Sequence, residues 1–318
     1  MAFELQSGES VEAGIRRIVD EQLASALEEM RGADPRKADA AVHSARKRFK
    51  RIRAVVRLVR QGLGPEVFER ENASFRDAGG TLSEARDATV LIQTLDTLKP
   101  SVEAGAFTTA HKRLLARRRA VRKRVLTGGN GLEAVARTVE EARQRAAEWR
   151  IIDGEGWAAL KPGLKRVYRD GRAAFERAQV GDHPELFHEW RKRVKDLWHH
   201  MEVLEAMWPA ALKPLAEEFH GLADTLGQEH DLSVLKSMLE AEALSRAEAP
   251  SGVIGALEEK RVALECEAKR AGARLFAEKT GAFMKRLGKY WAAWKGTETT
   301  ETAQPCGVEI EAVTSVQV

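Results

Sequence analysis

The chain has 318 residues, of which 31% are charged and 43% are hydrophobic, and its net charge is +4. This length and composition suit a protein with one large or two ordinary domains and a substantial core, and they exclude a membrane-spanning protein because no apolar run approaches roughly 18 residues. The N-terminus has no pattern of an export signal, and the two cysteines, Cys266 and Cys306, form neither a disulfide framework nor a zinc-binding spacing. We therefore expect a cytoplasmic protein without membrane association.

Apolar residues recur at helical spacing along most of the chain, and no stretch is typical of a strand. The pattern predicts an all-α fold, with an N-terminal extension over 1–10, a helical domain over 11–296 and a disordered tail over 297–318. Glycine and proline residues mark the breaks between helices. The predicted helices are 11–31, 42–60, 66–78, 82–98, 102–126, 131–149, 157–179, 185–207, 210–226, 231–247 and a long final helix over about 253–295.

The segment 42–60, VHSARKRFKRIRAVVRLVR, has eight Lys or Arg residues and no acid. At about 100° per residue, a helix here buries an apolar face and presents cations on the opposite face. No acid stands three or four residues away to pair with these cations, so the face predicts an anionic partner, with a solvated surface as the alternative. The candidate binding residues on it are His43, Arg46, Lys47, Lys50, Arg53 and Arg57.

The same pattern returns 145 residues later, where FHEWRKRVK at 187–195 matches VHSARKRFK at 42–50. A second pair of segments, FRDAGGTLSEARD at 75–87 and FHGLADTLGQEHD at 219–231, aligns Asp87 with Asp231. We expect these aspartates to cap the following helix or to hold a basic neighbour. The candidate binding residues of the second basic face are His188, Arg191, Lys192, Lys195 and His199.

This repeat predicts an internal duplication with halves over about 11–150 and 155–296. Two copies of one helical plan most simply pack as two antiparallel four-helix bundles about a pseudo-twofold axis. The two basic faces would then line a shared central channel or groove.

Two further basic sets are candidates for the same partner. Arg113 and Arg117 are neighbours one turn apart in an acid-free cluster of the helix 102–126. Lys165, Arg169 and Arg172 share one face of the helix 157–179, where Asp170 stands close enough to neutralise part of their charge. Solvation of these side chains is the alternative in both sets. Arg48 and Arg193, at the border of the apolar faces, are expected to be structural.

Motifs of catalysis are missing from the sequence. It has no phosphate-binding loop GxxxxGK[ST], no GxGxxG, no HExxH and no GxSxG. His199 and His200 are adjacent, so they point to different faces and do not form the i,i+4 pair of a metal site. We also find no repeated carboxylate pair suited to acid–base work or to Mg²⁺. We expect no catalytic residue, no metal and no cofactor, and hence a protein that is not an enzyme.

The duplicated H-x-x-R pattern, with the later elements Leu82 to Asp87 and Leu226 to Asp231, resembles the CHAD domain family over about residues 10 to 295. The resemblance implies two pseudo-symmetric four-helix bundles that bind inorganic polyphosphate through basic residues at a central cavity and surface, and association with polyphosphate granules. Trp198 stands where the first half has Arg53, so the second half is expected to grip less strongly. The chain lacks the ExExK strand motif of the triphosphate-tunnel domain fused to many family members, which argues against triphosphatase activity.

The predicted function is therefore non-enzymatic binding of polyphosphate, whose dense charge suits Lys and Arg. Nucleic acid is the alternative ligand, although aromatic residues for base stacking amount to only 6% of the chain. A scaffold for an acidic protein and a phosphohydrolase are further alternatives. The sequence indicates no oligomeric state.

Overall fold

The computed structural model describes residues 3–31, 38–81, 83–127, 131–152, 154–246 and 252–301. Within these ranges it contains α-helices and two short 3₁₀ turns and no strand, which confirms the all-α prediction. The last helix ends at Glu301, beyond the predicted start of the tail, and residues 302–318 lie outside the described residues. The helices are α1 Val11–Arg31, α2 Ala38–Leu58, α3 Arg60–Thr81, α4 Ser83–Asp96, α5 Ala104–Thr127, α6 Gly131–Ala147, α7 Trp157–Val180, α8 Pro184–Leu204, α9 Pro209–Arg246, α10 Val253–Leu275 and α11 Thr280–Glu301.

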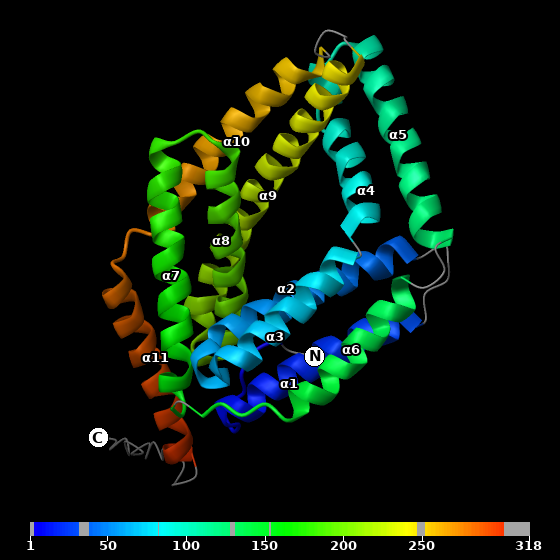
Figure 1. The fold of residues 1–318 in the computed structure, drawn as a ribbon. Helices are drawn as coiled ribbons and strands as arrows, with labels where there is room; N and C mark the ends of the chain where they lie inside the picture. The colour runs from blue at the N-terminus through cyan, green and yellow to red at the C-terminus, as the bar shows by residue number, and fades with distance from the viewer. Residues whose placement is uncertain are drawn as a thin grey trace, which may run out of the picture.

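Figure 1 shows two groups of helices that meet where α2 packs against α7 and α8. The first group is α1, α2, α3 and α6. The second group is α7, α8, α10 and the first part of α9, with α11 lying along α7. Helices α4 and α5 form a hairpin at the far ends of α9 and α10.

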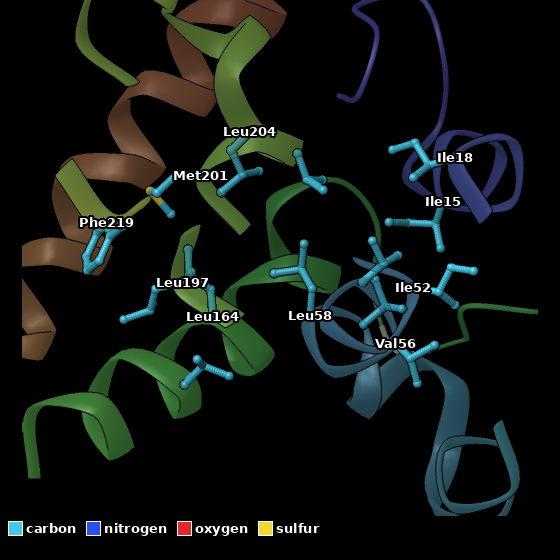
Figure 2. Close-up of a cluster of buried hydrophobic side chains, with 14 of the residues drawn as sticks. Ile15, Ile18, Ile52, Val56, Leu58, Leu164, Leu197, Met201, Leu204 and Phe219 are labelled. Carbon is cyan, nitrogen blue, oxygen red and sulfur yellow. The ribbon is translucent and has the colours of Figure 1, made fainter. Parts of the chain in front are cut away.

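A single hydrophobic core joins the two groups (Figure 2). It includes Ile15 of α1, Ile52 of α2, Leu164 of α7 and Leu197 of α8, each fully buried. Burial of one such side chain contributes about 1.5–3 kcal/mol, so this shared core holds α2 firmly against α8. The predicted halves therefore have one common core, and their pseudo-twofold relation stays a prediction.

A second, smaller hydrophobic cluster lies apart from this core. Leu95 of α4 and Leu114 of α5 pack there with Leu235 of α9 and Leu257 of α10. The long helix α9 thus begins in the first core and ends in the second. This second cluster fixes α4 beside α9, with its N-terminal end near α2.

Two predicted helix boundaries are wrong. The break expected between 226 and 231 does not exist, because α9 runs unbroken for 38 residues. Gly227 alone is too weak a signal to end a helix whose neighbours Leu226 and Leu232 are both buried.

Conversely, the predicted helix over 253–295 is interrupted after Leu275, where the side chain of Phe276 is buried. The Tyr168 hydroxyl lies 3.2 Å from the carbonyl oxygen of Leu275 and 2.9 Å from that of Glu278. A hydrogen bond from this hydroxyl satisfies a carbonyl that the interruption leaves free.

Candidate functional site

A pocket of about 470 Å³ lies between α2, α4, α8 and α9, and we call it the basic pocket. Six Lys or Arg side chains line it against two aspartates. Cations from segments far apart in the chain therefore converge on one cavity. Its lining residues are His43, Arg46, Lys47, Lys50, Arg86, Asp87, Val90, Leu91, Arg191, Lys195, His230, Asp231 and Val234.

The amphipathic pattern of α2 and α8 explains this convergence. Helix α2 buries Phe49 and Ile52 in the core, and α8 buries Val194 and Leu197. The opposite faces of both helices carry the cations. Because the shared core holds the two helices together, the pairs Arg46/Lys50 and Arg191/Lys195 meet across the basic pocket.

The two aspartates are not helix caps. Asp87 lies inside α4 and Asp231 inside α9, so the capping prediction is wrong. Asp87 instead holds a basic neighbour, since its Oδ1 lies 3.9 Å from Nη2 of Arg46. Burial raises the pKa of Asp231, although Arg191 and Lys195 nearby oppose that shift. Both carboxylates thus neutralise part of the positive charge of the basic pocket.

The two lysines at the centre of the basic pocket hold their protons weakly. Desolvation by the surrounding protein, followed by repulsion from Arg191, lowers the pKa of Lys195 to about 7 and that of Lys50 to about 8. The Lys50 side chain is exposed to solvent in the open cavity. The protein around it nevertheless displaces part of the water that would otherwise solvate its ammonium group. Crowded cations with little compensation attract anions strongly.

Arginines of the basic pocket also have few hydrogen-bond partners among the described residues. Arg46 donates a hydrogen bond to the carbonyl oxygen of Gly79. Nε of Arg191 is buried, and among the described residues it has no hydrogen-bond partner. Burial lowers the pKa of both arginines, but each stays protonated at neutral pH. An anion entering the pocket could satisfy the free donor of Arg191.

The histidines of the basic pocket are neutral near pH 7. Burial lowers the pKa of His230 to about 4, with repulsion from Arg191 as the next cause. Burial and the Arg86 guanidinium likewise lower the pKa of His43. A neutral imidazole still carries one N–H donor, so these rings can donate a hydrogen bond without adding charge.

Two smaller cavities share lining residues with the basic pocket. One, of about 180 Å³, shares Arg46 and Lys50 and adds Arg53 and Arg76. The other, of about 170 Å³, shares Arg86 and Asp231 and adds Lys260. The concave surface therefore continues beyond the basic pocket on both sides, and the side towards α3 is the more basic.

Two predicted residues of α2 have structural partners. Arg57 donates from Nη1 to Asp196 at 3.0 Å and from Nη2 to Asn72 at 3.1 Å. Arg53 donates to the same Asn72 oxygen at 3.1 Å, but it also lines the smaller cavity beside the basic pocket. At Arg57, the basic face of α2 therefore ends in a network of hydrogen bonds within the protein.

Three predicted residues of α8 do not line the basic pocket. His188 lies behind it, with its ring centroid 4.6 Å from that of His230. Lys192 pairs with Glu189 on the same helix. His199 is buried, and its Nδ1 lies 2.7 Å from Glu202. Of these, His188 has a ring contact with a residue that lines the basic pocket.

The remaining predicted residues lie elsewhere. Arg113 and Arg117 belong to α5, which packs mainly on α4. On α7, Arg169 pairs with Asp170 at 2.8 Å, and Arg172 pairs with Glu176 at 3.3 Å and donates to the carbonyl oxygen of Glu278. Lys165 is exposed on the same helix. We call Lys165, Arg169 and Arg172 the α7 stripe.

The structure also adds residues that were not predicted as site residues. Arg86 and Asp87 from α4 and His230 and Asp231 from α9 line the basic pocket. They stand in the second repeated segment, so the repeat itself was the available signal. Because we interpreted that segment as a helix-capping element, the sequence gave us no reason to expect it beside α2 and α8.

Comparison with known proteins identifies the family to which this chain belongs. The family model of the CHAD domain matches residues 21–240, and the chain therefore belongs to the CHAD domain family. The fold is similar to that in the crystal structure of the CHAD domain from the plant Ricinus communis. The TM-score is 0.60 at 18% sequence identity, over 88% of this chain and 96% of that chain. No curated protein matches the chain.

Within the part of the chain that the structure describes, no group of three or more His, Cys, Asp or Glu residues could hold a metal ion. No helix among the same residues is long and apolar enough to cross a membrane.

Proposed function

We propose that this protein binds inorganic polyphosphate in the basic pocket and does not act on it as an enzyme. The observation that carries the proposal is the meeting of Arg46 and Lys50 with Arg191 and Lys195 across one cavity. Repulsion among these like charges costs folding free energy, and a dense polyanion relieves it. Polyphosphate has one negative charge on each internal unit and offers only phosphate oxygens, which suit Lys and Arg donors.

The chemistry of the basic pocket favours polyphosphate over single-stranded nucleic acid. The only rings in its lining are those of His43 and His230, so it offers no large aromatic platform for a base. The neighbouring cavity with Arg53 and Arg76 gives a flexible chain a basic path out of the pocket. We propose that the polyphosphate follows this path along a groove of the protein. We also propose that the two halves of the protein on either side of this groove arose by internal duplication. A non-enzymatic role in the cytoplasm, at polyphosphate granules, follows from this proposal.

Binding of a fluorescently labelled long-chain polyphosphate tests the proposal. We expect the variant with Arg46, Lys50, Arg191 and Lys195 all replaced by Ala to lose binding while its helical circular dichroism is kept. A charge-matched control replaces Lys161, Lys279, Lys285 and Lys289, which are exposed outside the basic pocket, and should keep binding. Unchanged affinity of the pocket variant would show that another surface binds the polymer.

Competition separates the alternatives, because both polyphosphate and nucleic acid binding weaken with salt. Unlabelled polyphosphate should displace the labelled polymer, whereas single-stranded DNA and RNA at equal phosphate concentration should not. Nucleic acid that binds tightly and resists displacement by polyphosphate would contradict the proposal. Phosphate release on addition of Mg²⁺ or Mn²⁺, lost on replacing one carboxylate, would instead establish a phosphohydrolase.

A further inference from the structure

Two lysines of the basic pocket have no carboxylate within 4 Å among the residues that the structure describes. Lys50 of α2 and Lys195 of α8 line the same cavity. Among the described residues, neither Nζ atom has a hydrogen bond or an ion pair within 4 Å. Arg46, in contrast, has Asp87 at 3.9 Å. The folded protein thus compensates the charge of the two lysines only through aspartates that lie farther away.

Charged groups face these lysines from every helix around the basic pocket. Helix α7 packs on α8 where the rings of Phe175 and Trp190 are in contact, and none of its described residues lines the basic pocket. The groups that face the two lysines are His43, Arg46 and Lys47 from α2, Arg191 from α8, Arg86 and Asp87 from α4, and Asp224, Asp231 and His230 from α9, with His188 of α8 in contact with His230.

The balance of these groups leaves both lysines partly unprotonated near neutral pH. Burial and the neighbouring Arg191 outweigh the aspartates, so the pKa of Lys195 falls to about 7 and that of Lys50 to about 8. A neutral lysine neither attracts an anion by charge nor offers three donors. At pH 8 the empty pocket therefore carries less charge than its composition suggests.

A bound polyanion changes this balance, because opposite charges beside an ammonium group favour its protonated form. We propose that polyanion binding in the basic pocket takes up protons at Lys195 and Lys50, so that affinity rises as the pH falls from 9 towards 7. The inference rests on the proposed function. By linkage, a protein that takes up about one proton on binding gains about tenfold in affinity for each pH unit of acidification.

Isothermal titration calorimetry of the full chain with long-chain polyphosphate counts these protons. Titrations at pH 8 and equal ionic strength, in buffers of different ionisation enthalpy, give the number of protons exchanged from the slope of heat against buffer enthalpy. We expect uptake of about one proton per site at pH 8. Long chains keep the contribution of the titrating end phosphates small. This measurement needs no variant and does not depend on how a substitution folds.

A double variant, Lys50→Arg with Lys195→Arg, assigns the protons to the lysines. Because arginine stays charged throughout this pH range, we expect the variant to bind at pH 8.5 without proton uptake and with an affinity nearly independent of pH. Lys236→Arg is the matched control, since Lys236 on α9 pairs with Glu258 away from the basic pocket. It should take up protons as the unmodified chain does.

Three results would overturn the inference. Tight binding with no proton uptake by the unmodified chain would contradict it and leave the proposed function standing. Proton uptake that persists in the double arginine variant would assign the protons to the histidines or to the ligand. Failure of polyphosphate to bind at any pH from 6 to 9 would contradict both this inference and the proposed function.

Discussion

The basic pocket and the α7 stripe both gather Lys and Arg residues at helical spacing, but they differ in their acidic partners. In the α7 stripe, Arg169 and Arg172 each have an acidic side chain within 3.3 Å. In the basic pocket, Lys50 and Lys195 have none within 4 Å among the described residues, and Nε of Arg191 is buried without an acceptor. A basic helix face is thus a candidate ligand site where its cations have no close acid, and a structural surface where acids on the same helix pair with them.

The largest expected effect separates the two regions directly. We expect Arg191→Ala to weaken polyphosphate binding roughly a hundredfold, about 2.7 kcal/mol, because it removes an enclosed charged donor from the site. Arg169→Ala on the α7 stripe should change the affinity less than twofold, because that guanidinium is already paired and exposed. Fluorescence anisotropy at fixed salt measures both variants. Equal losses would mean that pairing with acids does not distinguish the two regions.

Arg57 tests the comparison within α2 itself, since it lies on the predicted ligand face but pairs with the buried Asp196 at 3.0 Å. We expect Arg57→Met to lower the free energy of unfolding by about 2 kcal/mol, because it leaves Asp196 with only Arg193, 3.4 Å away. Urea denaturation followed by circular dichroism measures this loss.

Adding Asp196→Leu to Arg57→Met should restore much of the stability by removing the uncompensated charge. If Arg57→Met kept full stability and lost binding as strongly as Arg191→Ala, Arg57 would belong with the ligand-binding residues.

The smallest expected effect concerns the fold rather than the ligand. The pKa of Lys195 in the folded state, about 7, lies below its ordinary value of 10.5. The charge of Lys195 therefore destabilises the fold fully below pH 7, and this cost disappears as the pH rises towards 10.5. Without ligand, Lys195→Met should raise the free energy of unfolding at pH 7 by on the order of 1 kcal/mol, with allowance for solvent screening.

The stability gain of Lys195→Met should shrink as the pH is raised from 7 to 10, which thermal denaturation at several pH values measures. A gain that stays constant over this range would attribute the effect to packing of the methionine and not to charge.

The helical fold and several residues that line the basic pocket could be predicted from periodicity and the repeat. Both basic faces could be predicted from the positions of apolar residues such as Phe49 and Val194, because burial of the apolar face of a helix turns the opposite face away from the core. The interruption after Leu275 could not be predicted, since it depends on Tyr168, a residue far away in the chain whose hydroxyl bonds to carbonyls at that point. The continuity of α9 likewise depends on burial against two separate clusters.

The partners of individual cations were harder to predict than the faces that carry them. Arg57 and Lys50 stand on one face of α2, but the packing of α8 brings Asp196 to Arg57, whereas no acid among the described residues lies within 4 Å of Nζ of Lys50. His199 follows the same helical spacing as Lys195 and is nevertheless buried beside Glu202. The pairing of Arg57 with Asp196 and the burial of His199 arise from contacts between helices, which no pattern along a single helix contains.

The smaller hydrophobic cluster of α4, α5, α9 and α10 has a consequence for synthesis on the ribosome. Leu95 and Leu114 leave the ribosome early, but their partners Leu235 and Leu257 follow only after α6, α7 and α8 have been made. At about 5–20 residues per second, the apolar face of the α4–α5 hairpin waits on the order of ten seconds for its partners. During translation this hairpin therefore exposes apolar surface that a chaperone can protect.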